Sequence, residues 1–177
     1  MLTNYSNNND MAAHEFMIYC IVRGIKPKSI LEIGVRSGIS TLAICEAIID
    51  GELIVDYNCC EINERCRQVQ TRTKAPLTFH IMSSDQLAEK WNKKIDLLFI
   101  DGCHEYSQVK KDYLNFGKFV NPNGFIFFHD TYPPSTKYIT PSYCWDAYKI
   151  LGDLKKDSTI EFITFPYSFG LTVCRKL

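Results

Sequence analysis

Short apolar runs alternate with amphipathic stretches along most of this chain. Buried strands appear in a sequence as continuous apolar runs, whereas helices repeat apolar positions every three or four residues. The alternation predicts a parallel sheet with helices on both faces. We expect strands at residues 29–33, 53–61, 77–82, 95–101 and 124–130, and helices at residues 11–23, 40–49, 62–71, 84–91, 107–119 and 143–155.

The texture changes after residue 130. Residues 131–143 are rich in Pro, Tyr, Ser and Thr, and we interpret them as a lid or a wall for a substrate. Two later runs, 159–165 and 170–175, are joined by PYSF and should pair antiparallel at the edge of the sheet. The predicted fold class is therefore α/β, with a doubly wound, mostly parallel, seven-stranded sheet and an antiparallel hairpin at its C-terminal edge.

Composition predicts a single domain over residues 11–177, preceded by a flexible, Asn-rich arm at residues 1–10. Asp10 is a candidate cap for the first helix. The 20 basic and 20 acidic residues give no net charge, and no basic cluster indicates nucleic-acid binding. We find neither a secretory or transit pattern nor a membrane-length apolar run, so we expect a cytoplasmic protein without a membrane partner.

The 8 cysteines show no paired CxxC spacing, and several lie within apolar runs. We therefore expect reduced and mostly buried thiols rather than a metal cluster or a disulfide framework.

A glycine turn follows the first predicted strand, in the segment EIGVRSG at 32–38. Gly34 would let the backbone bend away from the strand, and Gly38 would allow a ligand and the next helix to come close. Glu32 and Ser40 flank this turn, and we include them with the two glycines as candidate cofactor contacts. Arg36 stands where the GxGxxG dinucleotide motif has its second glycine, which argues against a nicotinamide or flavin.

Glu61 ends the second predicted strand, twenty-odd residues after the glycine turn. A carboxylate there can accept hydrogen bonds from both hydroxyls of a ribose. Glu61 could instead be an acid that interacts favourably with the start of a helix. Ser83, Ser84 and Asp85 follow the third strand, where the edge of an adenine could be recognised. The alternative for these residues is helix capping.

Two further strands stop at acidic residues, in IDLLFIDGCHEY at 95–106 and GFIFFHDTYPP at 124–134. Parallel strands bring Asp101 and Asp130 to the same rim, and the turn at Gly102 lets His104 fold back over it. Asp101 is also a candidate cofactor contact. Two carboxylates with water and substrate oxygens make a shell suited to magnesium, and His104 is a candidate general base. Turn formation or helix capping is the structural alternative for each residue taken alone.

The order of these motifs resembles the class I S-adenosylmethionine-dependent methyltransferases, from about residue 30 to the end. IDGCHEY followed by HDT is most similar to the small group that includes macrocin-type sugar O-methyltransferases and cephalosporin-hydroxylase-like proteins. The resemblance implies a Rossmann-like fold, S-adenosylmethionine as cofactor, catalysis by His104, Asp101 and Asp130, and metal ligands at Asp101, Asp130 and position 129. His129 stands where metal-dependent relatives carry a carboxylate, so magnesium, a softer divalent metal and no metal all stay open.

The predicted function is O-methylation of a hydroxyl on a small molecule such as a sugar, phenol or natural-product intermediate. A non-catalytic S-adenosylmethionine-binding module and a nucleotide-dependent reductase are the alternatives. Aromatic residues could wall the acceptor pocket, and a homo-oligomer could complete it; these residues are Tyr132, Tyr138, Tyr143, Trp145, Phe165, Tyr167 and Phe169.

Overall fold

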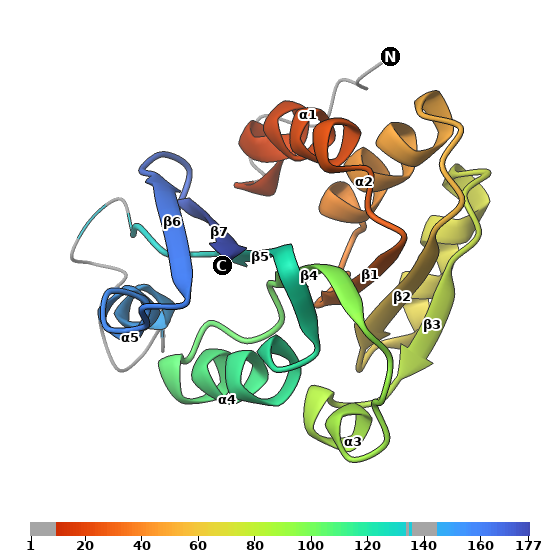
Figure 1. Cartoon of the computed structure of the whole chain (residues 1–177). Helices are drawn as coiled ribbons and strands as arrows, with labels where there is room; N and C mark the ends of the chain where they lie inside the picture. The colour runs from red at the N-terminus through yellow and green to blue at the C-terminus, as the bar shows by residue number, and fades with distance from the viewer. Residues whose placement is uncertain (1–9, 134, 136–144) are drawn as a thin grey trace.

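The computed structural model describes residues 10–133, 135 and 145–177 (Figure 1). Its centre is a seven-stranded sheet with the order β3-β2-β1-β4-β5-β7-β6. The strands are β1 (Ser29–Ile33), β2 (Asp56–Glu61), β3 (Thr78–Ile81), β4 (Ile95–Ile100), β5 (Val120–His129), β6 (Ile160–Phe165) and β7 (Leu171–Lys176). The helices are η1 (Met11–His14), α1 (Glu15–Ile25), α2 (Ile39–Asp50), η2 (Glu64–Arg72), α3 (Ser84–Ala88), α4 (Tyr106–Gly117), η4 (Ala147–Lys149) and α5 (Ile150–Leu154).

Helices cover both faces of the sheet, as the sequence pattern predicts. Figure 1 shows α1 and α2 on one side and α3 and α4 on the other. Each layer has its own buried apolar cluster, because successive strand residues point to opposite faces. Phe99 and Phe127 pack beneath α1 and α2, whereas Leu98 and Phe128 pack toward α4 and α5.

The strand order reverses between β1 and β4, which lie side by side in the middle of the sheet. The chain runs from β1 outward to β2 and β3, and then returns to β4 and continues outward to β5. A crevice forms at the carboxyl ends of the strands where the order reverses, and this is where ligands bind in open α/β sheets. Gly34 and Asp101 directly follow these two strand ends.

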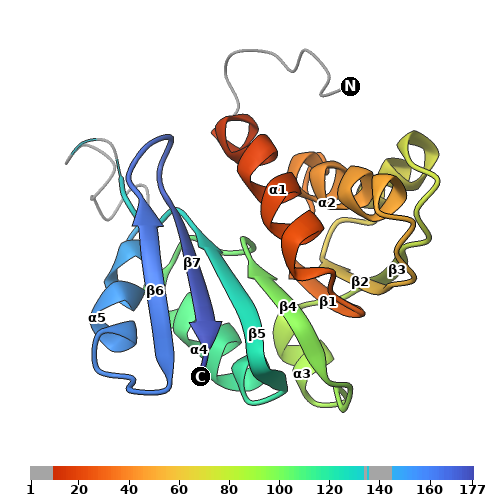
Figure 2. The ribbon, with the colours of Figure 1, turned by 45° about the horizontal axis from the view of Figure 1, so that its top comes forward.

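The predicted C-terminal hairpin is confirmed, and β7 lies between β5 and β6 in the sheet. Both of its pairings are antiparallel, with Val173 opposite Phe127 on one side and Ile163 on the other. Ser168, Phe169 and Gly170 have successive positive φ angles of 48°, 67° and 86° in the turn before β7. Figure 2 shows this turn beside the start of α1.

Several predicted boundaries differ from the structure. The fifth strand begins at Val120 instead of residue 124, because the polar segment before Gly124 continues the strand with a shift in register against β4. The polar helix predicted at 62–71 is a 3-10 helix at Glu64–Arg72, and α3 ends at Ala88. The predicted helix at 143–155 is observed as η4 and α5, and its first two residues lie outside the described part of the chain.

The described cysteines are free thiols, as predicted: five are buried, Cys103 is half-buried and Cys20 is exposed. Within the ranges that the structure describes, no helix has both the length and the apolar character needed to cross a membrane. Asp10 accepts a hydrogen bond from the Met11 backbone N–H at 3.0 Å, which confirms its predicted capping role.

Candidate functional site

The glycine turn brings the ends of β1 and β4 into direct contact. Gly34 has φ +89°, and a Cβ atom there would lie 2.2 Å from the backbone oxygen of Asp101. Gly38 has φ +79° and is the N-cap of α2, where a Cβ atom would lie 2.4 Å from a methyl group of Val69. Only glycine accepts both the positive φ and the close approach. The predicted turn is therefore confirmed as the link between the first strand and the site.

Glu61 holds the glycine turn from the end of β2. One carboxylate oxygen accepts hydrogen bonds from the backbone N–H groups of Val35 and Arg36, at 3.1 and 2.9 Å. The other accepts from Ile62 and Asn63, at 2.8 and 3.1 Å. The carboxylate therefore lies at the crevice, but a ribose bound there would share it with these backbone donors or displace some of them. The ribose contact stays a prediction.

Glu32 differs from its prediction as a cofactor contact. Its side chain is fully buried and accepts hydrogen bonds from Ser40 at 2.6 Å, Thr41 at 2.8 Å and Tyr57 at 2.7 Å. Burial raises its pKa to about 7, although these three hydroxyls oppose the shift. Side chains alternate between the two faces of a strand, and that of Glu32 points to the face of β1 that α2 covers. Glu32 thus fastens the start of α2 to β1 and β2 and lines neither cavity of the site.

Two cavities meet over the carboxyl ends of the strands, and both are lined by Gly34, Glu61 and Gly102. One, of about 210 Å³, continues past Ile62, Met82 and Cys103 toward α3 and α4. The other, of about 290 Å³, continues past Asp101, His104 and His129. Ser40 lines this second cavity, although its hydroxyl is engaged by Glu32.

The predicted serines after β3 lie at the rim of the smaller cavity. Ser83 forms a reciprocal capping box with Gln86 at the start of α3, and Ser84 accepts a hydrogen bond from Gln108 at 3.2 Å. The capping alternative is therefore confirmed for Ser83, while an adenine contact stays a prediction. Residues on α4 that line this cavity, such as Gln108 and Asp112, were missed because helical polar patterns usually indicate solvent exposure.

The predicted catalytic residues meet in one cluster. His104 Nδ1 donates a hydrogen bond to Oδ2 of Asp130. His129 Nδ1 lies between both carboxylates, 3.2 Å from Oδ1 of Asp101 and 3.3 Å from Oδ2 of Asp130. Asp130 has a positive φ of 60°, a strained conformation outside glycine that commonly marks functional sites. This turn of the backbone brings its carboxylate between the two histidines.

Opposite charges control the titration of this cluster. Burial alone would lower the pKa of His129, but Asp101 and Asp130 together raise it well above its usual value. The pKa of His104 is also raised, because Asp130 outweighs burial. Burial would raise the pKa of Asp130, but the two histidines hold it well below the usual range. Burial raises the pKa of Asp101 against the opposing effect of His129.

The N-terminal segment also reaches this cluster, which sequence reasoning missed. Asp10 and Met11 line the larger cavity, and the buried His14 packs edge-on against His129 with ring centroids 5.4 Å apart. Asp10, His129 and Asp130 each offer a metal-ligand atom, and these atoms lie within 4.8 Å of one another. In the sequence, Asp10 was recognisable only as a helix cap. No sequence pattern indicates that residues 10 and 129 lie close together in the fold.

One part of the predicted aromatic wall lies beside His104. The ring of Trp145 is 4.9 Å from that of His104, and Phe169 packs edge-on against Trp145 at 4.7 Å. Phe165 packs against the core, whereas Tyr132 and Tyr167 are about half exposed. Tyr138 and Tyr143 lie outside the described residues.

Residues 31–131 match a protein family described as a methyltransferase domain. This match covers the glycine turn, Glu61 and both acidic strand ends in their observed order. The chain belongs to this family. The membership confirms the resemblance to class I S-adenosylmethionine-dependent methyltransferases that the motifs predicted.

Solved structures share the fold of this methyltransferase. The Podospora anserina methyltransferase PaMTH1, solved with S-adenosylhomocysteine, is 22% identical with a TM-score of 0.73, over 93% of this chain and 78% of that one. TomG from Streptomyces achromogenes, an O-methyltransferase of tomaymycin synthesis solved with S-adenosylmethionine, is 14% identical with a TM-score of 0.69, over 93% and 80%. An O-methyltransferase from Bacillus cereus is 12% identical with a TM-score of 0.70, over 98% and 83%.

A curated relative, the uncharacterized protein y4gI of Sinorhizobium fredii, is 23% identical over 166 residues. The alignment covers 85% of this methyltransferase but only 17% of y4gI. The chain therefore corresponds to a small part of that relative.

Proposed function

We propose that this protein transfers a methyl group from S-adenosylmethionine to a hydroxyl of a small molecule. The two joined cavities carry the proposal, because they share Gly34, Glu61 and Gly102 at the point where the strand order reverses. The smaller cavity suits an adenine, since it is lined by Ile62, Met82 and Cys103. The larger one then receives the methionine part and places the sulfonium methyl beside His104.

His104 is the proposed general base. Its Nδ1–H is held by Asp130, so Nε2 is the ring nitrogen left to take a proton from the acceptor hydroxyl. The hydroxyl oxygen attacks the methyl carbon as the carbon–sulfur bond breaks, and S-adenosylhomocysteine and the methyl ether are the products. Asp130 stabilises the imidazolium that forms. Positioning of the two reactants supplies most of the acceleration in such a displacement.

A divalent metal fits this cluster. Nε2 of His129 and Oδ1 of Asp130 are buried and have no hydrogen-bond partner among the described residues. Asp101 instead accepts from Nδ1 of His129, so we assign it the role of orienting that histidine, which metal-binding histidines commonly require. When bound, the metal would lower the pKa of the acceptor hydroxyl. The imidazole favours manganese, iron or zinc over magnesium.

The acceptor is proposed to enter between Met11, Trp145 and His104, which line the larger cavity. A planar or sugar-like acceptor would pack on the indole ring of Trp145. We propose that a second subunit completes the acceptor site, with the half-exposed Tyr132 and Tyr167 as candidate contacts.

A non-catalytic S-adenosylmethionine-binding module is the second candidate. His129 favours it, because its imidazolium could neutralise Asp101 and Asp130 in place of a metal and so leave the acceptor side without a function. The nucleotide-dependent reductase has no support from the methyltransferase family.

Calorimetry and an acceptor screen test the proposal. S-adenosylhomocysteine should bind with or without Mn²⁺, and mass spectrometry should detect a gain of one methyl group on at least one member of a panel of sugars, phenols and catechols. His104→Gln should abolish turnover and leave S-adenosylhomocysteine affinity intact. His80→Gln is the matched control, since His80 contacts Asn58 on β2 at 3.0 Å and lines neither cavity. Cofactor binding without any methylated product would favour the module.

A further inference from the structure

We infer that Asp10, from the segment before α1, is a ligand of a divalent metal together with His129 and Asp130. The three residues bring one ligand atom each to within 4.8 Å of one another. One imidazole and two carboxylates form a donor set that suits Mn²⁺, Fe²⁺ or Zn²⁺. A catalytic role for this ion rests on the proposed function, while the binding of the ion can be tested by itself.

The buried atoms of His129 and Asp130 point to a missing partner. The two residues are only 4% and 6% exposed, yet Nε2 of His129 and Oδ1 of Asp130 find no hydrogen bond among the described residues. A buried polar atom without a partner is unfavourable, because it has lost its hydrogen bonds to water and gained none in the protein. A cation between these atoms and the Asp10 carboxylate would satisfy both of them. Asp101 already holds Nδ1 of His129 and so leaves Nε2 as the ligand nitrogen.

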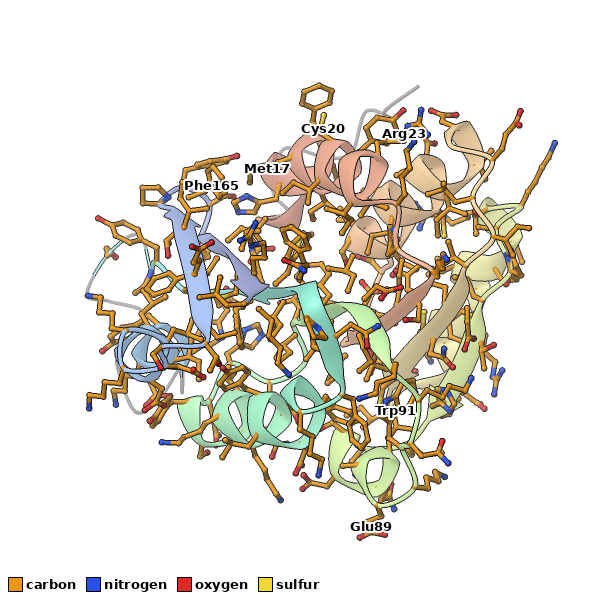
Figure 3. All side chains as sticks on the ribbon, viewed as in Figure 1. Met17, Cys20, Arg23, Glu89, Trp91 and Phe165 are labelled. Atoms are coloured by element: carbon orange, nitrogen blue, oxygen red, sulfur yellow. The ribbon has the colours of Figure 1, made fainter. Side chains whose placement is uncertain are left out.

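The position of Asp10 is fixed from a distant part of the chain. Ser168, in the turn between β6 and β7, donates its hydroxyl hydrogen to the Asp10 backbone oxygen at 2.7 Å. Its own backbone oxygen accepts from Nε2 of His14 at 3.2 Å, and the His14 ring packs 4.8 Å from that of Tyr167. In Figure 3, Met17 near the start of α1 and Phe165 at the end of β6 lie at the same edge of the molecule.

This attachment indicates that Asp10 is held in place over the site. Ser168 and Phe169 both adopt positive φ angles, which are unfavourable for residues other than glycine. The turn accepts this strain and presents both the hydroxyl and the backbone oxygen of Ser168 to the N-terminal segment. Asp10 and His129 both line the larger cavity, so an ion can reach them from solvent.

Titration calorimetry with Mn²⁺ tests the inference. The wild-type chain should bind one Mn²⁺, and Asp10→Ser should weaken its affinity at least tenfold. Serine caps a helix as well as aspartate does, so η1 should be kept, but its hydroxyl is too short to replace the carboxylate. Asp10→Asn, which keeps an amide oxygen as a weak ligand, should be intermediate. Glu89→Gln removes an acid at the opposite edge of the molecule in Figure 3 and should leave the affinity unchanged.

Cobalt gives a second measurement that does not depend on activity. Co²⁺ should show visible absorption bands in the wild-type chain, and these bands should change in Asp10→Ser. Equal Mn²⁺ affinity in wild type and Asp10→Ser, or no Mn²⁺ binding by the wild type at millimolar concentration, would overturn the assignment. S-adenosylhomocysteine affinity, measured in the same samples, separates the two proposals. A protein that binds Mn²⁺ but not S-adenosylhomocysteine would support the metal site and contradict the proposed function.

Discussion

Glu61→Gln provides the sharpest test of cofactor binding at the glycine turn. The carboxylate accepts four backbone hydrogen bonds at 2.8 to 3.1 Å, which place it between the turn and the end of β2. Glutamine has nearly the same size but removes the charge and turns one acceptor oxygen into a donor. A hydrogen bond to a charged group contributes about 1.5–3 kcal/mol. At about 1.4 kcal/mol per tenfold change, the dissociation constant for S-adenosylhomocysteine should rise about 10-fold to 100-fold.

Calorimetry on the folded variant measures this change, with Glu89→Gln as the charge-matched control. Analogues of S-adenosylhomocysteine that lack the 2′ or 3′ hydroxyl separate ribose binding from a general loosening of the turn. If Glu61 binds the ribose, the wild-type protein should bind these analogues more weakly than it binds S-adenosylhomocysteine. Glu61→Gln should bind the analogues nearly as well as it binds S-adenosylhomocysteine. Unchanged affinity of a folded Glu61→Gln variant for S-adenosylhomocysteine would refute the ribose assignment.

Three further outcomes are expected. His104 must be neutral to act as a base and its pKa is raised, so kcat/KM should fall as pH decreases through a value above 6.5; Asp130→Asn should move this limb to lower pH in a pH–rate profile. Gly34→Ala should lower the free energy of unfolding in urea by about 3 kcal/mol or more, because its Cβ meets backbone at 2.2 Å, whereas Gly24→Ala in open space on α1 should raise it by about 0.5–1 kcal/mol. Glu32 has a folded pKa of about 7 against 4.5 in the unfolded chain, so the folded state keeps its proton and stability should decline by roughly 3 kcal/mol as pH rises from 4.5 to 7; Glu32→Gln should flatten this decline in urea unfolding at each pH.

The arrangement of strands and helices was predictable from the sequence because local signals determine it. Apolar residues dominate β1, β4 and the second half of β5, since both faces of the sheet are covered there. The turn at Gly34 was predictable because only glycine accepts its geometry. Since parallel strands end at the same edge, the sequence also indicated that Asp101, His104 and Asp130 would meet.

Tertiary structure alone decided what surrounds the side chains of Glu32 and His129. Glu32 lies one residue before the end of β1, and its alternation places it inside, against Ser40 and Tyr57, instead of in the crevice. His129 lies within 3.3 Å of both carboxylates, and Asp130 reaches it from a backbone with positive φ, which a sequence motif does not reveal for a residue other than glycine.

Contacts between distant segments were equally hidden. Asp10 joins His129 only because β7 lies between β5 and β6, so that the turn carrying Ser168 reaches the N-terminal segment. The sequence by itself determined the fold, the glycine turn and the acidic rim, since these depend on local periodicity and on the common direction of parallel strands. The composition of the candidate metal site depends on non-local packing, and only the tertiary structure decided it.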